Sequence, residues 1–192
     1  GGINISDRYA NSTRVTDQIY WRDTHVKLTG QSVHYLQFLF ISDWNFCAEE
    51  EFVPEKVYFG EAKKDGDVGA VVQIAASGPD SDNPTILFAL LDAIGLAEEE
   101  ILITTPYFIP GESLLNELTV AALSGIKVKL LVPDRSDSFT VDAAARSYYR
   151  DLLQSGVEIY LYKKGFVHAK TLVSDTQLSI VGTANMDHRS FD

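Results

Sequence analysis

Residues that could take part in catalysis lie close together near the end of this sequence. His168, Lys170 and Asp175 form the pattern His-x-Lys-x4-Asp, and Gly182-Thr183-Ala184-Asn185 follows after six further residues. A histidine can act as nucleophile, base or acid near neutral pH, and a lysine carries a positive charge there. Small and amide residues let hydrogen-bond donors approach a negatively charged oxygen. This combination predicts a site that handles a phosphate group.

The spacing within the motif separates two roles. Side chains alternate between the two faces of a strand, so His168 and Lys170 should project from the same side and meet one phosphate. Asp175 has the opposite parity and falls in a predicted turn. We count it in the catalytic motif as an organiser that bonds the backbone or another residue, and not as a third group on the phosphate.

The Gly-Thr-x-Asn segment is the predicted phosphate-binding part. We expect Gly182 to let the neighbouring strand come close, and Thr183 and Asn185 to donate to non-bridging phosphate oxygens. Such donors typically contribute about 10²–10³ in rate when they face developing negative charge. Lysine and amide groups supply the positive field, and the sequence has no carboxylate cluster at metal-ligand spacing. We therefore expect no metal and no other cofactor.

The start of the sequence resembles the phosphate-binding segment near its end. Gly1-Gly2-Ile3-Asn4-Ile5-Ser6-Asp7-Arg8 shares its pattern of glycine, asparagine, aspartate and arginine with the segment 182–189. Asn4 is therefore the expected counterpart of Asn185 in phosphate binding. If the motif repeats in full, a first His-x-Lys-x4-Asp should precede Gly1, and residue 1 should lie inside a first catalytic half.

Strand and helix patterns alternate between these motifs. Apolar runs predict strands at 71–76, 101–108, 126–132 and 157–162 and a hairpin of 166–174 with 178–184; helical spacing predicts helices after Pro84, over 112–124 and up to Gly156. Glycines 125 and 156 supply the left-handed conformation that ends a helix. The alternation predicts an α/β fold with a mixed, largely parallel sheet flanked by helices. Loops at strand ends commonly shape ligand sites, which makes the apolar loop 106–110 a candidate.

The first sixty residues follow a different pattern. A strand is predicted within 19–30 and an amphipathic helix over 31–44, and the segment after residue 60 is rich in glycine and charge. We therefore divide the chain into a remnant of a first half at 1–60, a linker at 61–69 and a second half at 70–192.

Composition narrows the class of protein. The 192 residues are 45% hydrophobic and carry a net charge of −11, which argues against a surface that binds nucleic acid. The longest apolar runs are too short to span a bilayer, so we expect this piece to be soluble. One cysteine, Cys47, excludes an internal disulfide.

Four segments resemble one protein family over essentially the whole chain. WRDTHVKLTG (21–30), TPYFIP (105–110), VPDRSD (132–137) and the run AARSYYRDLLQSGVEIYLYKKGFVHAKT (144–171) are similar to bacterial cardiolipin synthases of the phospholipase D superfamily. The resemblance implies an α-β-α sandwich, here truncated at both ends, and two catalytic halves. It also implies membrane-spanning N-terminal segments, and so a place in the bacterial cytoplasmic membrane for the full-length protein. The implied reaction joins two phosphatidylglycerols, anionic phospholipids, through a phosphatidyl-histidine.

Roles for individual residues follow from the same resemblance. One histidine is implied to attack phosphorus while the other protonates the departing glycerol, and we assign His168 to the acid and base role. For Asp23 two interpretations stay open: it orients the first-half histidine, or it is a carboxylate on the sheet surface. The acidic residue that orients His168 is expected beyond Asp192.

Three other functions remain as alternatives. A phospholipase D-type hydrolase would use the same residues with water as acceptor, and a nuclease of the superfamily is disfavoured by the acidic charge. A non-catalytic module that binds phosphate or a lipid headgroup belongs to another class. Because one histidine cannot be both nucleophile and acid, we expect the 192-residue piece to be inactive alone; a homodimer that pairs two His168 side chains is the exception.

Overall fold

The computed structural model describes residues 4–11, 19–49, 51–61, 69–78, 81 and 83–191. The chain forms two compact units, Gly1–Val26 with Ser77–Asp192, and Lys27–Ala76. Most of the predicted linker, residues 62–68, lies outside the described residues, and so do Gly1, Gly2 and Ile3 of the N-terminal repeat. The His-x-Lys-x4-Asp motif and Asp23 both belong to the first unit.

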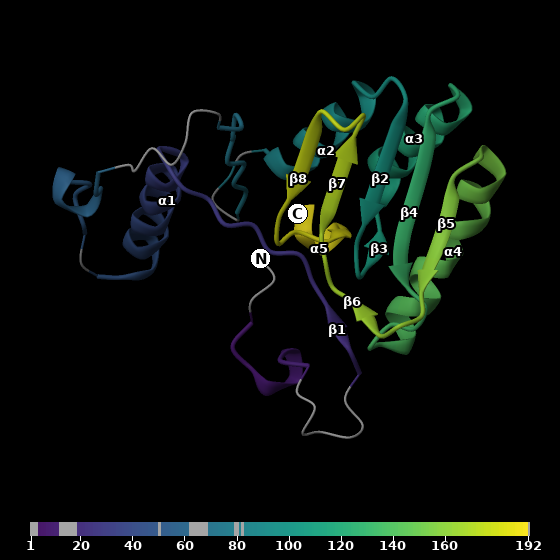
Figure 1. Ribbon diagram of the computed structural model, residues 1–192, viewed down its shortest axis with the longest axis horizontal. Helices are drawn as coiled ribbons and strands as arrows, with labels where there is room; N and C mark the ends of the chain where they lie inside the picture. Colours follow the sequence, from purple (N-terminus) through teal and green to yellow (C-terminus); the bar gives the residue numbers. More distant parts are fainter. Residues whose placement is uncertain are drawn as a thin grey trace. The chain divides into compact units, whose positions relative to one another are not determined.

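A five-stranded mixed sheet forms the centre of the first unit (Figure 1). Its order is β5 (Glu158–Tyr162), β4 (Lys127–Pro133), β2 (Glu100–Thr104), β7 (Thr171–Ser174) and β8 (Leu178–Val181). Strands β2, β4 and β5 are parallel, whereas β7 runs antiparallel to both β2 and β8. The predicted α/β class, mixed sheet and terminal hairpin are therefore confirmed.

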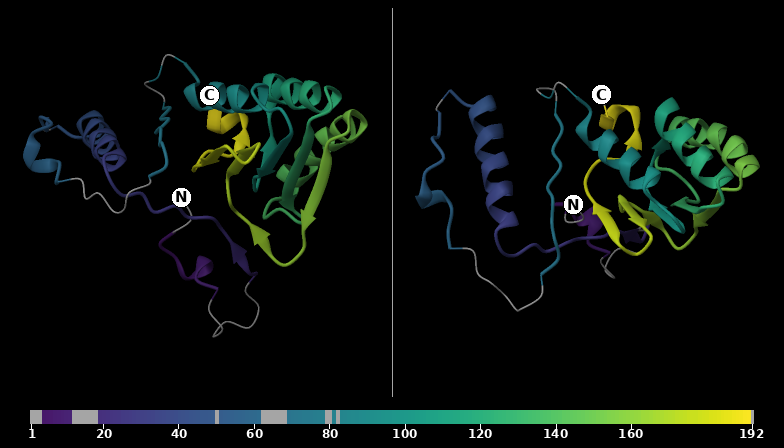
Figure 2. Two further views of the ribbon diagram at one scale, coloured as in Figure 1. Left: turned by 45° about the horizontal axis from the view of Figure 1, so that its top comes forward. Right: turned by 90° about the horizontal axis from the view of Figure 1, so that it is seen from above.

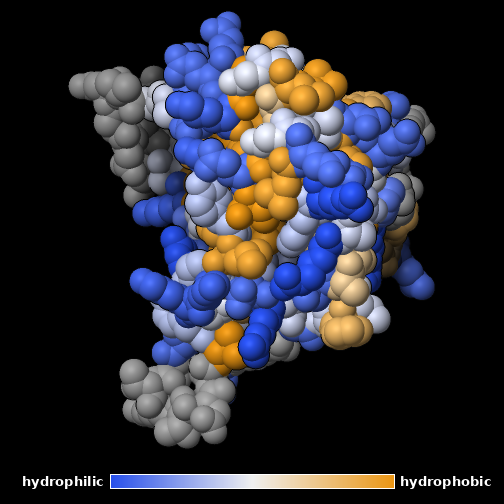
Figure 3. Space-filling model, turned by 90° about the vertical axis from the view of Figure 1, so that its right-hand side faces the viewer, coloured by the Kyte–Doolittle hydropathy of each residue, from blue (hydrophilic) through white to orange (hydrophobic). Residues whose placement is uncertain are grey.

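Three helices cover one face of this sheet: α2 (Thr85–Gly95), α3 (Gly111–Leu123) and α4 (Phe139–Ser155) (Figures 1 and 2). Their apolar sides meet alternate residues of the strands in one core, which includes Leu114, Leu118, Ile101, Ile103, Val128, Leu130, Leu152 and Leu172. As expected, Gly125 and Gly156 end helices in the left-handed region, with φ of 97° and 102°. Along the side formed by α4 and β5, apolar side chains lie among polar ones at the surface (Figure 3), and Phe139 and Leu153 are among those exposed.

Two pairs of short strands add to the first unit. Strand β1 (Trp21–Arg22) runs parallel to β6 (Phe166–Val167), and β3 (Phe108–Ile109) runs parallel to β9 (Met186–Asp187). The helix α5 (His188–Phe191) and the 3-10 turn η1 (Asp7–Tyr9) complete it.

Several predicted strands are shorter than their apolar runs. The run 101–108 breaks after Thr104, because Thr105 and Pro106 turn the chain: the Thr105 hydroxyl donates to the Tyr107 carbonyl at 2.8 Å. The run 166–174 breaks at residues 168–170, and only two residues of 19–30 pair as a strand. In each case the length of the strand is set by the neighbouring strand with which it pairs, and not by the length of the apolar run.

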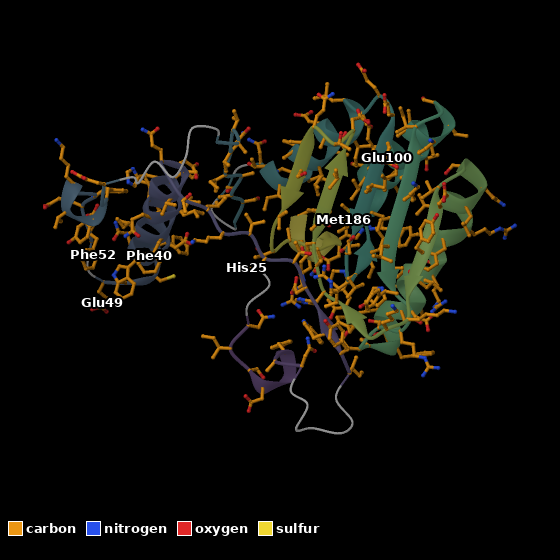
Figure 4. The ribbon with its side chains drawn as sticks, in the orientation of Figure 1. His25, Phe40, Glu49, Phe52, Glu100 and Met186 are labelled. Atoms are coloured by element: carbon orange, nitrogen blue, oxygen red, sulfur yellow. The ribbon has the colours of Figure 1, made fainter. Side chains whose placement is uncertain are left out.

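The second unit contains the helix α1 (Ser32–Cys47), which confirms the helix predicted there, and the 3-10 turn η2 (Lys56–Tyr58). The Asn45 amide bonds both backbone groups of Phe52 at 2.8 Å, and Phe40 and Phe52 flank Trp44 (Figure 4). The strand predicted at 71–76 is wrong: these residues are described without strand structure, and Val71 is fully exposed. Within the described residues, the helices are all too short or too polar to cross a bilayer.

Candidate active site

The pairing of β1 with β6 brings Asp23 to His168. The register places Trp21 opposite Phe166 and Arg22 opposite Val167, and the His168 backbone N–H donates to the Arg22 carbonyl at 2.7 Å. Residues opposite each other in a parallel pair point to the same side of the sheet. One residue further on, Asp23 Oδ2 therefore lies 3.0 Å from His168 Nδ1.

Two residues hold β1 against β6. At Gly165, φ is +141°, and a Cβ there would overlap the Tyr20 carbonyl, which accepts the Phe166 N–H at 2.8 Å. On the other side of β1, the Asn11 amide bonds both backbone groups of Trp21, at 2.6 and 2.7 Å. Contacts on both edges of β1 therefore set the position of Asp23, the residue that follows this strand.

Lys170 contacts the other nitrogen of the histidine ring. Its Nζ is 2.9 Å from His168 Nε2 and donates to the His168 carbonyl at 2.7 Å. Residues 168–170 are not a strand in this structure, yet the two side chains meet as the spacing predicted. The site is thus a chain of contacts from Asp23 through His168 to Lys170.

The contacts of His168 select one form of its ring. The Asp23 carboxylate only accepts, so Nδ1 carries the proton, and Nε2 presents its lone pair to the Lys170 ammonium. Burial lowers the pKa of His168 below its ordinary value; the Asp23 bond and, more weakly, Asp137 oppose this change, whereas the charge of Lys170 adds to it. The imidazole is therefore neutral at pH 7, with Nε2 able to bond phosphorus or accept a proton.

Burial also lowers the pKa of Lys170, to about 8, although the carboxylates of Asp23 and Asp187 act to raise it. The lysine keeps most of its charge at pH 7 but loses it within the range in which enzymes are assayed. A partly desolvated cation of this kind interacts strongly with an incoming anion.

Several residues of the site are absent from the sequence prediction. The rings of Trp21 and Phe166 lie 5.0 and 6.1 Å from the His168 ring and help to bury it. Asp187 and Asp137 act on Lys170 and His168 through their charge. Asp187 lies two residues after the Gly-Thr-x-Asn segment and could have been found there. Asp137 ends the VPDRSD segment, which carries the family resemblance but no motif that assigns this residue a role.

The partner of Asp23 was not predicted from the sequence. The two interpretations of Asp23 were that it orients a first-half histidine or is a carboxylate on the sheet surface, and the acidic partner of His168 is expected after Asp192. In the structure Asp23 itself bonds His168, and its side chain is only 11% exposed. The pairing of β1 with β6 decides this, because it joins segments 145 residues apart.

Asp175 lies at the opposite end of β7 from the site. Its carboxylate accepts the backbone N–H groups of Glu98, Glu99 and Glu100 at 2.6, 2.9 and 2.7 Å. Glu100 lies at the upper end of the sheet in Figure 4, whereas β1 and β6 lie at its lower end in Figure 1. Asp175 thus bonds backbone groups, and no described contact joins it to His168 or Lys170.

The predicted phosphate-binding segment lies beside Lys170. The Gly182 N–H donates to the Lys170 carbonyl at 3.2 Å. A Cβ on this glycine would meet only Ala184 N, at 4.0 Å, so the expected close strand approach does not explain it. Thr183 is exposed, whereas Asn185 Oδ1 is buried and has no hydrogen-bond partner among the described residues. Unsatisfied buried amides are rare outside functional sites.

Among the described residues, no side-chain contact joins Asn4 to His168 or Lys170. Asn4 is exposed, and its carbonyl accepts the Ser6 N–H at 3.0 Å. Within the described residues, His, Cys, Asp and Glu side chains form no group of three that could hold a metal ion.

Comparison with known proteins identifies the family. The family described as "Cardiolipin synthase, PLD-like domain" matches residues 90–192, more than half of the chain. The chain belongs to this family. It is 44% identical to cardiolipin synthase 2 of Bacillus cereus and 43% identical to the major cardiolipin synthase of Bacillus subtilis, and both matches cover 100% of this chain. The chain spans only 37% and 39% of those relatives.

Among solved structures, a phospholipase D family member, Nuc from Salmonella typhimurium, superposes with a TM-score of 0.49 at 20% identity. The superposition covers 56% of this chain and 68% of that one.

Proposed function

We propose that this chain supplies one catalytic half of a phosphatidyltransferase that makes cardiolipin from two phosphatidylglycerols through a phosphohistidine. The observation that carries the proposal is the Asp23–His168–Lys170 chain of contacts, at 3.0 and 2.9 Å, in a member of the cardiolipin synthase family. It offers an oriented imidazole next to a cation, which is what transfer of an anionic phosphoryl group requires.

The reaction uses two histidines. In the first step a histidine nitrogen bonds phosphorus, the bond from phosphorus to the glycerol oxygen breaks, and that oxygen takes a proton. In the second step the hydroxyl of another phosphatidylglycerol bonds phosphorus and gives up its proton as the nitrogen–phosphorus bond breaks. We assign the proton transfers to Nε2 of His168, because Asp23 stabilises the charged ring that forms. A bound anion raises the pKa of such a ring, so the ring takes up the proton that it donates to the glycerol oxygen in the first step.

Phosphate binding falls to Lys170 and the Gly-Thr-x-Asn segment. Two of the Lys170 contacts end on His168, and the third ammonium proton is available for a phosphate oxygen. The Gly182 N–H bond to the Lys170 carbonyl places this segment beside the lysine, which supports a role for Gly182, Thr183 and the Asn185 amide N–H group in the same site. Asn4 is proposed as the corresponding residue of the first half.

The substrate and the division into halves belong to the same proposal. The substrate is an anionic phospholipid, so the enzyme acts at the bacterial cytoplasmic membrane. Residues 1–60 are proposed to complete the first half, 61–69 to link the halves, and 70–192 to form the second half. The contact of Asp23 with His168 fits this division, because it joins a residue of the first half to a histidine of the second.

Product analysis tests the proposal. A chimera in which this chain replaces the matching 39% of the Bacillus subtilis relative is incubated with phosphatidylglycerol vesicles. Cardiolipin and free glycerol in equal amounts are expected, and His168→Ala should abolish both. If the product is phosphatidic acid, the enzyme is a hydrolase and the transferase proposal is wrong. Activity that persists in the His168→Ala chimera would remove this histidine from the mechanism.

A further inference from the structure

The end of the sheet that carries the candidate active site also carries a group of exposed cations. Arg135 lies in the loop between β4 and α4, and Lys163 and Lys164 lie in the turn between β5 and β6. The Asp134 N–H donates to the Tyr162 carbonyl at 3.1 Å, so this loop and this turn are neighbours at one end of the sheet (Figure 1). All three cationic side chains are exposed, and none of them bonds or pairs with another described residue.

The same end of the first unit exposes apolar side chains. Phe139, the first residue of α4, is 87% exposed, and Ile19 and Tyr20 before β1 are 66% and 51% exposed. The Tyr20 carbonyl accepts the Phe166 N–H at 2.8 Å, which places Ile19 and Tyr20 beside the turn that carries the two lysines. Cations interspersed with exposed aromatic and aliphatic residues are typical of surfaces that lie at a lipid interface. We call the set the site-end surface: Ile19, Tyr20, Arg135, Phe139, Lys163 and Lys164.

Charge is unevenly distributed along this unit. The glutamates at 98–100 lie at the opposite end of the sheet, where Glu100 is labelled in Figure 4. The carboxylates of the site end already have partners: Asp23 with His168, Asp137 with Tyr107 at 2.9 Å, and Asp134 and Asp142 with Arg146. Because the whole chain has a net charge of −11, it can approach an anionic bilayer only with a face whose cations are unpaired.

We propose that the site-end surface docks on an anionic phospholipid bilayer, with its cations at the headgroups and Phe139 in the interface. This inference rests on the proposed function and names the face through which the enzyme meets its substrate. The turn that carries Lys163 and Lys164 leads directly into β6, and His168 follows β6, so docking brings this histidine close to the lipid phosphates. A nucleic acid is the competing polyanion. The exposed apolar side chains favour the bilayer, which offers them an apolar interior.

Cosedimentation with lipid vesicles tests the surface on the 192-residue chain. Phosphatidylcholine vesicles that contain phosphatidylserine supply negative charge without the proposed substrate. The chain should bind these vesicles, more weakly as salt is raised, and should not bind vesicles of phosphatidylcholine alone. The triple variant Arg135→Gln, Lys163→Gln, Lys164→Gln should bind about 100-fold more weakly, at about fivefold for each cation. Phe139→Ala should weaken binding about 10-fold.

Two matched controls come from the opposite end of the sheet. Lys127→Gln removes an exposed lysine at the start of β4, and Leu123→Ala shortens a side chain that is 71% exposed at the end of α3. Both variants should bind as the unchanged chain does. Unchanged binding by the triple variant overturns the proposal, and so does equal loss in the triple variant and in Lys127→Gln.

Three further results would name a different ligand or surface and also overturn the proposal. Equal binding to phosphatidylcholine alone would assign the contact to apolar residues elsewhere, such as those exposed on α1. Displacement by inorganic phosphate, but not by sodium chloride of the same ionic strength, would assign the cations to a discrete phosphate site. Tighter binding to single-stranded DNA than to the anionic vesicles would assign them to a nucleic acid.

The vesicle assay separates this inference from the proposed function, because it requires neither turnover nor phosphatidylglycerol. Charge-dependent docking would stand even if the chimera released phosphatidic acid, in which case only the transferase proposal fails. Conversely, cardiolipin formation by the chimera together with no vesicle binding by the 192-residue chain would overturn the docking surface and leave the transferase proposal intact.

Discussion

The bond between Asp23 and His168 determines which ring nitrogen reaches the substrate. An Asp23→Asn side chain can donate to Nδ1, which would move the ring proton to Nε2 and remove the lone pair from the reacting position. We expect kcat in the chimera to fall by about 10²–10⁴-fold, the usual contribution of acid–base catalysis. Nitrogen-15 NMR of the 192-residue chain should show the proton on Nδ1 in the unchanged protein and on Nε2 in the variant.

Asp151→Asn, which removes an exposed carboxylate from α4, is the control for loss of a carboxylate charge, and should change neither the rate nor the ring signals. If Asp23→Asn lowers the rate while the proton stays on Nδ1, Asp23 acts through its charge alone and the tautomer argument is wrong.

The lowered pKa of Lys170 predicts an alkaline limit to activity. With a pKa of about 8, this lysine loses its charge as the pH rises past 8, so kcat/KM should decline there. The groups that face it are His168, which is neutral at this pH, and the carboxylates of Asp23 and Asp187, which stay charged. Lys170→Arg keeps its charge at all these pH values. The variant should have a lower kcat/KM at pH 7, and its kcat/KM should not decline above pH 8. If kcat/KM declines above pH 8 equally in both proteins, a group other than Lys170 causes the decline.

Among the structural elements, the contact between β1 and β6 depends on Gly165. Gly165→Ala would force its Cβ into the Tyr20 carbonyl and push β1 away, so Asp23 would leave His168 while the five-stranded sheet stays intact. Hydrogen exchange should accelerate at the Phe166 and His168 amides, which donate to β1 and the residue before it, and not in β4. Gly125→Ala is the matched control, because it also has a positive φ but meets nothing within 4 Å. Equal acceleration in both variants would show general destabilisation instead.

The turn between β7 and β8 depends on Asp175. Three backbone N–H groups hold the pKa of this carboxyl below its ordinary value, so its stabilising effect is present at neutral pH and is lost as the pH falls through the lowered pKa. Asp175→Asn should therefore unfold at a lower temperature at pH 7, and the difference from the unchanged chain should shrink below about pH 4. The same change in the chimera should leave kcat/KM unaltered. A large loss of activity without loss of stability would restore Asp175 to the chemistry.

These elements also show what the sequence could reveal. The meeting of His168 with Lys170 joins residues two positions apart, and spacing predicts such contacts well. The position of Asp175 in a turn follows from spacing too, but its backbone partners, residues 98–100, lie 75 to 77 residues away and were not predicted. The Asp23–His168 bond and the Tyr107–Asp137 pair join segments 145 and 30 residues apart, which local patterns do not encode. The sequence predicts α2, α3 and α4 because apolar spacing reports the buried face of a helix directly. The strand at 71–76 failed because an apolar run says nothing about whether a partner strand exists.

The full reaction requires more than the residues of this one motif. The sequence contains a single complete His-x-Lys-x4-Asp, whereas a phosphohistidine route needs one histidine on phosphorus and another to move the proton. We therefore expect the 192-residue chain to bind phosphatidylglycerol but not to turn it over, and the chimera to regain turnover. Sedimentation should find the chain monomeric under the same conditions.

Dependence on protein concentration distinguishes the remaining possibility. If two copies associate so that two His168 side chains meet one phosphate, turnover by the chain alone should rise with the square of its concentration at low occupancy of the dimer. Mixing it with excess His168→Ala chain should then suppress the rate, because mixed dimers hold one histidine each. First-order turnover by a monomer would instead mean that a single histidine suffices, and the two-histidine mechanism proposed here would be wrong. The contact between Asp23 and His168 favours the two-half enzyme, since it already lies within one chain and needs no second copy to form.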